Sequence, residues 1–199
     1  MDSKKTIAYH GSAALFDHFD PAHILEGAAR CRFGAGAYLT SRYTTAAHYA
    51  GASGRPEKYV YTVEIPDLEA GNHIFSAQPV PPEIVARAEE KLGVSIPEKA
   101  CTKGKFFRKW IGNTLLGIGN TVNQRTGSAS PEAEKAASAF LLGIGVVLLV
   151  WPTAQTKPEA GNNYAVLDYN AIRILQVDSV ELDKDKQLIE GSQKTLVKY

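Results

Sequence analysis

The chain has few of the residues that stabilise small secreted proteins or anchor proteins in membranes. Its 199 residues include two cysteines, Cys31 and Cys101, which are too few for a disulfide framework and lack the spacing of a metal site. The longest apolar run, residues 140–151, is too short to cross a bilayer and is interrupted by Gly143 and Gly145. No signal-like segment opens the sequence. These features predict a cytoplasmic protein with no metal and no membrane partner.

Acidic residues are missing from residues 99–128, a region that holds six basic residues in a chain whose net charge is +1. Its centre carries Lys103, Lys105, Arg108 and Lys109 among aromatic residues, a pattern typical of an amphipathic helix. Two interpretations of this basic stretch stay open. It is either a solvated helix face or a surface that contacts the phosphates of a nucleic acid.

The composition, 44% hydrophobic and 22% charged, is that of a globular protein long enough to bury a sizeable core. Alternating and short apolar runs predict strands at residues 5–9, 37–40, 58–65, 146–150, 164–167 and 172–177. Helical spacing and capping residues predict helices at residues 44–49 and 103–116, a helix that opens at Pro81-Pro82 and carries an apolar stripe to Leu92, and a helix start at Ser130-Pro131. We therefore expect an α+β fold, one domain over residues 1–199, with a helical, partly basic insertion at about 79–128.

Three segments carry residues suited to one kind of chemistry. They are His10-Gly11-Ser12 after the first predicted strand, a glycine-rich turn that leads to Tyr38, and Tyr49 eleven residues later. Glycine lets the main chain approach a ligand closely, an imidazole can bond a hydroxyl, and tyrosine rings can stack on a flat cationic ring. This set suits a site that grips nicotinamide and its ribose. Cleavage of the bond between them needs a stabilised oxocarbenium-like sugar and requires no metal.

These segments resemble the ADP-ribosyltransferase superfamily, in the His-Tyr-Glu branch that contains diphtheria toxin and the poly-ADP-ribose polymerases. His10-Gly11-Ser12 is similar to the first motif of that branch, and Phe33-Gly34-x-Gly36-x-Tyr38 with Ala47-x-Tyr49 is similar to the second. Gly143-Ile144-Gly145 and residues 163–168 are similar to the ADP-ribosyltransferase domains of phage polyvalent proteins and bacterial toxins. The resemblance implies a split, mixed or antiparallel β-sheet that binds NAD.

Carried over position by position, the resemblance implies that His10 binds the ribose and Gly11 binds the nicotinamide carboxamide. Ser12 belongs to the same NAD-binding segment, and Tyr38 and Tyr49 would flank the nicotinamide ring. The chain departs from the family pattern in two places. Ala46 stands where the family has a small hydroxyl residue, which removes one carboxamide contact.

The second departure lies in the third motif, where Asn163 stands at the position of the family's glutamate. The resemblance implies that this glutamate orients the ribose 2′-hydroxyl and supports the developing cation. An asparagine can bond the hydroxyl but offers no charge. Asn163 is therefore a catalytic candidate beside His10 and Tyr38, and relatives that lack the glutamate tend toward transfer of a single ADP-ribose or none. The acidic residues that could take its role instead are Glu64, Glu159 and Asp168.

The resemblance implies an NAD-dependent mono-ADP-ribosyltransferase that modifies a protein or nucleic acid and releases nicotinamide. By analogy, it would be an intracellular toxin or defence effector of a bacterium or phage, with a protein antitoxin as a partner. Two other functions stay open. One is an NAD glycohydrolase with water as the acceptor, and the other is a non-catalytic module that binds NAD or ADP-ribose.

Overall fold

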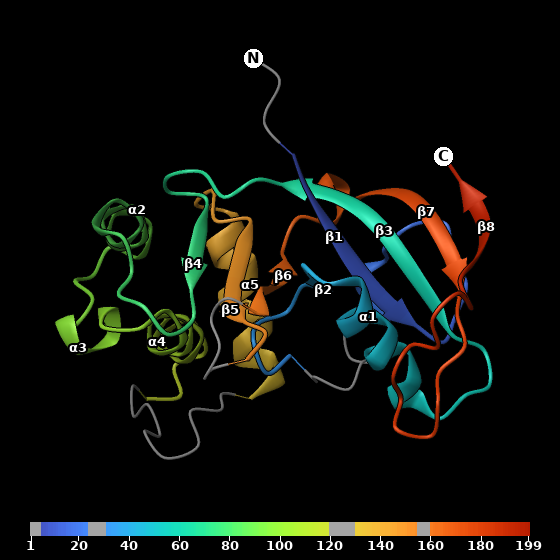
Figure 1. Ribbon diagram of the computed structural model, residues 1–199. Coiled ribbons are helices and arrows are strands. Elements are labelled where there is room, and N and C mark those ends of the chain that lie inside the picture. The colour runs from blue at the N-terminus through green and yellow to red at the C-terminus, as the bar shows by residue number, and fades with distance from the viewer. Residues whose placement is uncertain (1–4, 24–30, 120–129, 155–159) are drawn as a thin grey trace.

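The computed structural model describes residues 5–23, 31–119, 130–154 and 160–199 of the chain (Figure 1). The strands are β1 (Lys5–Ser12), β2 (Ala37–Thr40), β3 (Tyr59–Pro66), β4 (His73–Phe75), β5 (Leu148–Pro152), β6 (Asn162–Val166), β7 (Arg173–Ser179) and β8 (Lys194–Lys198). The α-helices are α1 (Tyr43–Ala50), α2 (Pro82–Leu92), α3 (Glu98–Cys101), α4 (Gly104–Leu116) and α5 (Pro131–Leu142). Short 3₁₀ helices lie at Pro21–His23, Gly51–Ser53 and Tyr169–Ala171.

One mixed sheet runs through the molecule in the strand order β4-β5-β6-β2-β1-β3-β7-β8. β4 and β5 are parallel, and the other neighbouring pairs are antiparallel. The sheet and its helices make the α+β fold that the sequence predicts. Helices α2, α3 and α4 follow β4 and fall within the region expected as a helical insertion.

The sheet divides into two halves between β1 and β2. β1 pairs with β3 along its whole length, from Lys5 opposite Pro66 to Ser12 opposite Tyr59. In contrast, β1 and β2 share one registered pair, Tyr9 opposite Thr40. The half that contains β4, β5, β6 and β2 is thus joined to the half that contains β1, β3, β7 and β8 by a narrow contact (Figure 1).

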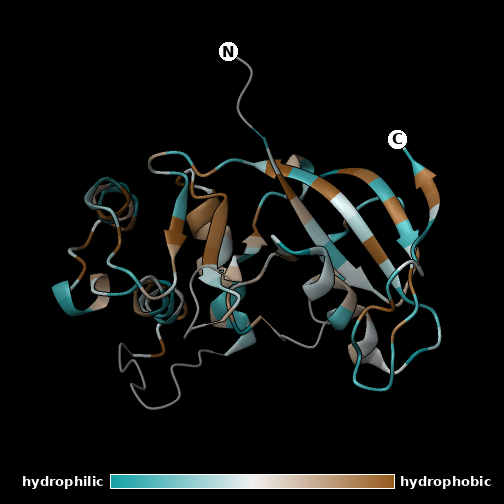
Figure 2. Ribbon diagram, in the orientation of Figure 1, coloured by the Kyte–Doolittle hydropathy of each residue, from teal (hydrophilic) through white to brown (hydrophobic). Residues whose placement is uncertain are grey.

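Alternation along the strands places two apolar clusters on opposite faces of the half-sheet that contains β4, β5, β6 and β2. Leu148 on β5 faces one side and packs in a cluster that includes Tyr61 and Val63 of the other half-sheet. Its neighbour Leu149 faces the opposite side, in a cluster with residues of α2, α4 and α5. Apolar residues therefore recur along β3, β5 and β7 (Figure 2). The first cluster holds the two halves together, and the second attaches the helices.

Residues at the helix ends explain where the helices begin and end. Ser130 Oγ accepts a hydrogen bond from the N–H of Ala133 at 3.2 Å, and Pro131 occupies the first turn of α5. α2 likewise begins at Pro82, and it ends at Gly93, which has the left-handed conformation that stops a helix. The two helix starts agree with those predicted from the sequence.

Three elements were not expected. β4 has three residues, and its partner β5 lies far along the chain, so the local sequence carries little signal. β8 is an edge strand whose residues are mostly exposed, which hides any alternation. α3 is a helix of four residues. Within the described part of the chain, none of the helices has the length and apolar character that a bilayer crossing requires.

Candidate active site

His10 lies on β1 at the boundary between the two halves of the sheet. Its Nδ1 lies 2.7 Å from the main-chain oxygen of Tyr38 on β2. Because a carbonyl oxygen can accept but not donate, Nδ1 carries a proton and donates it. The imidazole thus takes the place of the main-chain N–H that a continuous β1–β2 ladder would supply. The first and second motifs therefore meet at the split in the sheet.

The surroundings of His10 favour a neutral imidazole. Its ring packs edge-on against the rings of Phe16, Phe19 and Tyr61, with centroid distances of 5.9, 5.2 and 6.1 Å. Burial lowers the pKa of His10 below its ordinary value, and the hydrogen bond to Tyr38 opposes this shift. A neutral ring with its proton on Nδ1 leaves the lone pair of Nε2 as an acceptor.

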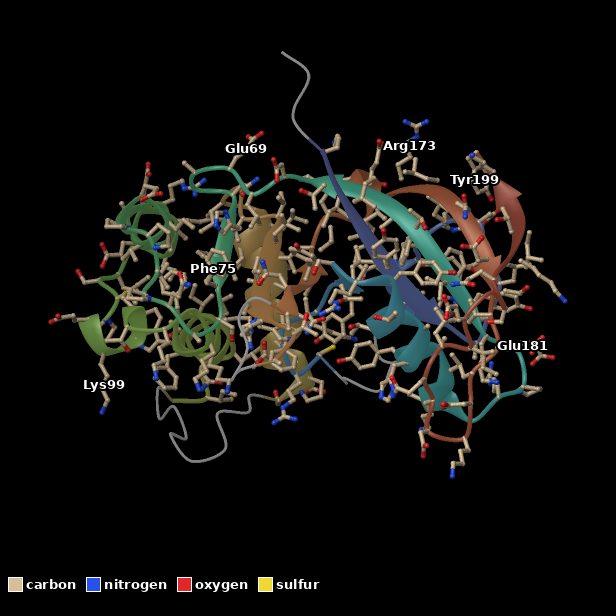
Figure 3. All side chains as sticks on the ribbon, viewed as in Figure 1. Glu69, Phe75, Lys99, Arg173, Glu181 and Tyr199 are labelled. Carbon is tan, nitrogen blue, oxygen red and sulfur yellow. The ribbon has the colours of Figure 1, made fainter. Side chains whose placement is uncertain are left out.

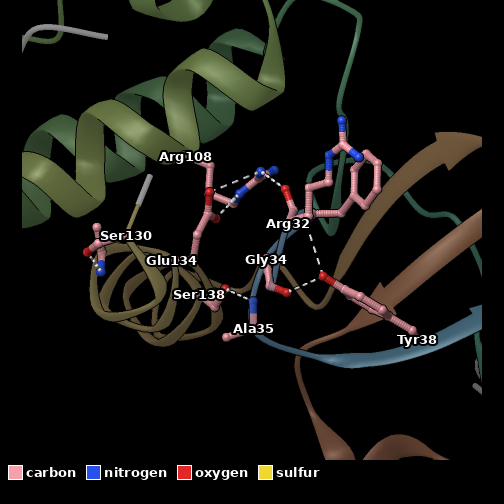
Figure 4. A network of polar contacts seen from close by, with 10 residues as sticks. Arg32, Gly34, Ala35, Tyr38, Arg108, Ser130, Glu134 and Ser138 are labelled. Atoms are coloured by element: carbon pink, nitrogen blue, oxygen red, sulfur yellow. Dashed lines mark hydrogen bonds and ion pairs between the residues drawn. The ribbon is translucent and has the colours of Figure 1, made fainter. Parts of the chain in front are cut away.

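Tyr38 is held at both its hydroxyl and its ring. The hydroxyl donates to the main-chain oxygen of Gly34 at 2.8 Å and accepts from the N–H of Phe33 at 3.0 Å (Figure 4). The ring lies edge-on to Trp151, with centroids 5.5 Å apart. Gly34 has a φ of 108°, and a β-carbon there would lie 2.3 Å from Leu149 Cδ1, so the turn requires glycine. Tyr38 therefore has a fixed orientation in this turn.

Two helices hold the turn that precedes Tyr38. Arg108 on α4 forms a buried ion pair with Glu134 on α5, and its Nη2 donates to the main-chain oxygen of Arg32 at 3.3 Å. Ser138 Oγ on α5 accepts from the N–H of Ala35 at 2.8 Å (Figure 4). α4 and α5 thus fix the second motif through polar contacts, a role that the sequence analysis missed. No local signal could have revealed it, since Ser138 lies 103 residues from Ala35.

Gly11 lies directly beneath α1. A β-carbon at Gly11 would lie 1.8 Å from the main-chain oxygen of Ala46 and 2.7 Å from the nitrogen of Ala50, so α1 and β1 pack main chain to main chain. This contact gives Gly11 a structural role, and its contact with a carboxamide stays a prediction. Ala46 is fully buried at the same contact, which explains why a small residue stands there.

Ser12 and Tyr49 lie close to this contact in the sequence and are more accessible. Ser12 Oγ accepts from the N–H of Ala14 at 3.0 Å and so supports the turn after β1. Tyr49 lies on the outer side of α1, is 51% exposed, and has its ring 6.1 Å from that of His48. No ring contact joins Tyr49 to Tyr38 among the described residues. A grip on nicotinamide by these two rings stays a prediction.

Asn163 is a buried residue with an unmet hydrogen-bonding need. It stands on β6 opposite Thr40 of β2 and Trp151 of β5, two residues from Ala165, which stands opposite Tyr38. Asn163 is 4% exposed, and within the described residues its Oδ1 has no hydrogen-bond partner. An unpaired buried carbonyl costs about 1–3 kcal/mol, and native proteins keep few of them. A free acceptor thus lies where the resemblance predicts a contact with a ribose hydroxyl.

Two of the three acidic alternatives to Asn163 have structural partners among the described residues. Asp168 Oδ1 accepts from the N–H of Asn170 at 3.1 Å and caps the 3₁₀ helix that follows. Glu64 on β3 forms an ion pair with Arg173 on β7 at 3.4 Å. Glu159 lies outside the described residues. Asn163 therefore stays the third candidate residue, and its role stays a prediction.

The structure corrects the expected basic surface on α4. Arg108 and Lys109 are 2% and 4% exposed, so neither presents its charge to a nucleic acid. Arg108 instead forms an ion pair with Glu134, 26 residues further along the chain. Burial, followed by the charge of Arg108, lowers the pKa of Lys109 to about 8. Helical spacing alone could not reveal this burial, because it does not show which face meets α5.

The other members of the basic stretch are more accessible. Lys103 and Lys105 lie over the ring of Phe106, with Nζ 5.8 and 5.2 Å from its centroid. Lys99 projects away from the body of the molecule at α3 (Figure 3). Arg125 lies outside the described residues. A contact with nucleic acid through Lys103 and Lys105 stays a prediction.

The candidate residues approach the split from both faces of the sheet. Tyr9 and Thr40 are register partners, and Gly11 and Tyr38 each lie two residues from them, so these four residues share one face. His10 packs on the opposite face and reaches Tyr38 through the split. One hollow of about 430 Å³ is lined by Leu15, Phe16, Asp17, Val177, Val197 and Tyr199. Its lining residue Phe16 packs against His10, but none of the candidate residues lines it. No group of three His, Cys, Asp or Glu side chains in the described ranges could hold a metal ion.

Comparisons with known proteins add little to this geometry. No family model matches the chain, and no curated protein matches it. Among solved structures, it is similar to a chain of the M. tuberculosis MbcT–MbcA toxin–antitoxin complex. The identity is 14%, the match covers 89% of this chain and 85% of that one, and the TM-score is 0.44. A likeness this distant carries no argument about chemistry.

Proposed function

We propose that the chain is an NAD-consuming enzyme of ADP-ribosyltransferase type, which transfers a single ADP-ribose to a macromolecule. The observation that carries the proposal is the hydrogen bond from His10 Nδ1 to the main-chain oxygen of Tyr38. This bond joins two motifs predicted from the sequence at the narrow split in the sheet. It also sets the imidazole in the form that accepts a hydrogen bond at Nε2, as contact with a ribose hydroxyl requires.

In the proposed reaction, the bond between ribose C1′ and the nicotinamide nitrogen breaks, and nicotinamide leaves with the bonding electron pair as a neutral molecule. The ribose becomes oxocarbenium-like, and a nucleophile of the acceptor then attacks C1′ and loses its proton to solvent. His10 would accept a hydrogen bond from the ribose, while Tyr38 and Tyr49 would flank the nicotinamide. A neutral His10 adds no positive charge beside the developing cation.

Asn163 is the proposed partner of a second ribose hydroxyl. Its buried Oδ1 has no partner among the described residues, and a hydroxyl of the substrate would satisfy it. An amide oxygen supplies a dipole in place of a full negative charge, so it stabilises the cation less than a carboxylate would. We therefore expect slow transfer of single ADP-ribose units.

The test is incubation with biotinylated NAD in a cell lysate, with nicotinamide release and macromolecular labelling measured together. We expect His10→Ala and Tyr38→Ala to lower nicotinamide release by about 100-fold. His10→Asn is a matched variant, because its amide nitrogen can donate to Tyr38 but nothing replaces Nε2, so it should be as inactive as His10→Ala. The proposal is wrong if the alanine variants release nicotinamide as fast as the natural chain.

The same assay separates the other functions. Free ADP-ribose that accumulates without a labelled macromolecule would indicate an NAD glycohydrolase. Binding of NAD without nicotinamide release, unchanged by Asn163→Glu, would indicate a binding module. Loss of the label on nuclease treatment, weakened by Lys103→Ala and Lys105→Ala, would identify a nucleic-acid acceptor.

A toxin with a protein antitoxin is the biological setting we propose for this activity. Growth arrest on expression of the natural chain, relieved by His10→Ala, would support it. Equal growth arrest by both chains would contradict it.

A further inference from the structure

The segment that follows β1 is fastened to the sheet by one buried hydroxyl. Tyr61 on β3 is fully buried, and its hydroxyl accepts from the N–H of Phe16 at 2.7 Å. The same hydroxyl donates to the main-chain oxygen of Ala14 at 3.1 Å. A tyrosine hydroxyl can donate one hydrogen bond and accept others, so both capacities are used on this one segment.

The fastened segment packs two aromatic rings, Phe16 and Phe19, against His10. The ring of Phe16 stacks on that of Tyr61 at 4.2 Å with an interplanar angle of 8°. His10 stands opposite Tyr61 in the β1–β3 register, so its imidazole meets this aromatic cluster from the same face. Phe19 lies edge-on to the imidazole at 5.2 Å and edge-on to Phe16 at 5.1 Å. Three rings therefore limit rotation of the imidazole, while the bond to Tyr38 fixes its Nδ1 side.

We propose that Tyr61 is a positioning residue for His10. Through the Phe16–Phe19 segment, the Tyr61 hydroxyl holds the His10 imidazole in its Nδ1-protonated form. Its importance for catalysis rests on the proposed function, in which Nε2 accepts from the ribose. The effect of Tyr61 on the orientation and protonation of the His10 imidazole does not depend on that function. Without the Tyr61 hydroxyl, the segment loses both anchors, and the half-buried imidazole becomes more exposed to water.

The ionisable groups near His10 leave burial as the main influence on its protonation. Asp17 and His18 on the same segment pair with each other at 2.6 Å and are largely exposed. The hydrogen bond to Tyr38 opposes the effect of burial on the pKa of His10. Exposure of the ring to water should therefore raise this pKa toward the ordinary histidine value. The remaining ionisable side chains on β1, β2, β3 and residues 13–23 are Lys5, Tyr9, Asp20, His23, Tyr38, Tyr59, Tyr61 and Glu64.

The experiment compares Tyr61→Phe with Tyr43→Phe by ¹⁵N NMR of the histidine rings, with His10→Asn used to assign the His10 signals. Tyr61→Phe keeps the stacked ring and removes only the hydroxyl. Tyr43 is the matched control, because its hydroxyl donates to Asp178 at 2.9 Å, away from His10. We expect the natural chain and Tyr43→Phe to show an Nδ1-protonated His10 with a lowered pKa. In Tyr61→Phe, we expect a raised pKa and a mixture of tautomers.

The kinetics of NAD turnover provide a second measurement. If the proposed function holds, Tyr61→Phe should lower kcat by about tenfold or more with a smaller change in KM, since misplacement of a catalytic group acts on the chemical step. If the natural chain does not consume NAD, the NMR comparison still decides the role of Tyr61. Failure of the two proposals is therefore distinguishable.

A second variant keeps the test decisive if Tyr61→Phe does not fold. Phe16→Leu retains the main-chain N–H that bonds Tyr61 but removes the stacked ring, and it should also raise the pKa of His10. The proposal is overturned if the folded variants lose thermal stability while the tautomer and pKa of His10 match those of the natural chain.

Discussion

At the scale of single residues, Asn163 combines burial with an unpaired oxygen. Leucine has a similar volume and no carbonyl, so Asn163→Leu removes the unsatisfied group without a large cavity. We expect the free energy of unfolding to rise by about 1 kcal/mol. We also expect nicotinamide release to fall by about 100-fold. Denaturant unfolding and NAD turnover measure the two effects.

Thr153 offers a matched control for this substitution. Its Oγ1 is another buried oxygen that has no partner within the described residues. Thr153→Val should therefore also raise the free energy of unfolding, but leave turnover unchanged. If Asn163→Leu instead destabilises the chain and leaves turnover intact, Asn163 serves the fold and not the substrate.

At the scale of elements, α4 and α5 are tied by charge. Arg108 and Glu134 are each 2% exposed, and Glu134→Ala would leave a buried guanidinium without its carboxylate. We expect this change to lower the free energy of unfolding by about 3–5 kcal/mol. The double variant Arg108→Met with Glu134→Leu should recover most of that loss, because no charge stays buried. Urea unfolding measures both.

The double variant should still impair the site. It removes the donor to the main-chain oxygen of Arg32, which helps to hold the turn before Tyr38. We therefore expect near-natural stability with reduced nicotinamide release. Full turnover in a stable double variant would show that the turn does not need Arg108.

Elements that carry their own periodicity or caps could be predicted from the sequence. Ser130-Pro131 marked the start of α5, and the alternation of residues 58–65 marked β3. β4 and β8 could not be predicted, because their pairing comes from strands distant in sequence or from an exposed edge. The burial of Arg108 and Lys109 was missed for a related reason, since helical spacing does not identify the partner helix.

Part of the geometry of the candidate site could be predicted. The order and spacing of the two motifs singled out His10 and Tyr38, and the structure brings them into contact through a main-chain oxygen. The supporting contacts of Tyr61, Glu134 and Ser138 have no signature in the sequence, because each depends on how distant segments pack. The position of Tyr49 relative to Tyr38 likewise depends on α1 and not on the eleven-residue spacing.

At the scale of the whole molecule, the two half-sheets share one apolar cluster although their strands scarcely pair across the split. Leu148 is fully buried in this cluster. Leu148→Ala should lower the free energy of unfolding by about 2–5 kcal/mol. Hydrogen exchange should accelerate equally in β3 and β6, since both halves lose the same packing. Acceleration in β6 alone would show that the halves unfold independently.

Acid should protonate His10 without separating the two halves of the sheet. Since burial places its pKa in the folded chain below the ordinary 6.5, the stability contributed by the neutral ring is complete above that value. This stability is lost as the pH falls toward the lowered pKa. The added proton goes to Nε2, because Nδ1 already donates to Tyr38. A fall in pH through the lowered pKa should therefore switch the site off reversibly, because the protonated imidazole would repel an incoming hydroxyl proton while the His10–Tyr38 hydrogen bond keeps the two halves of the sheet joined.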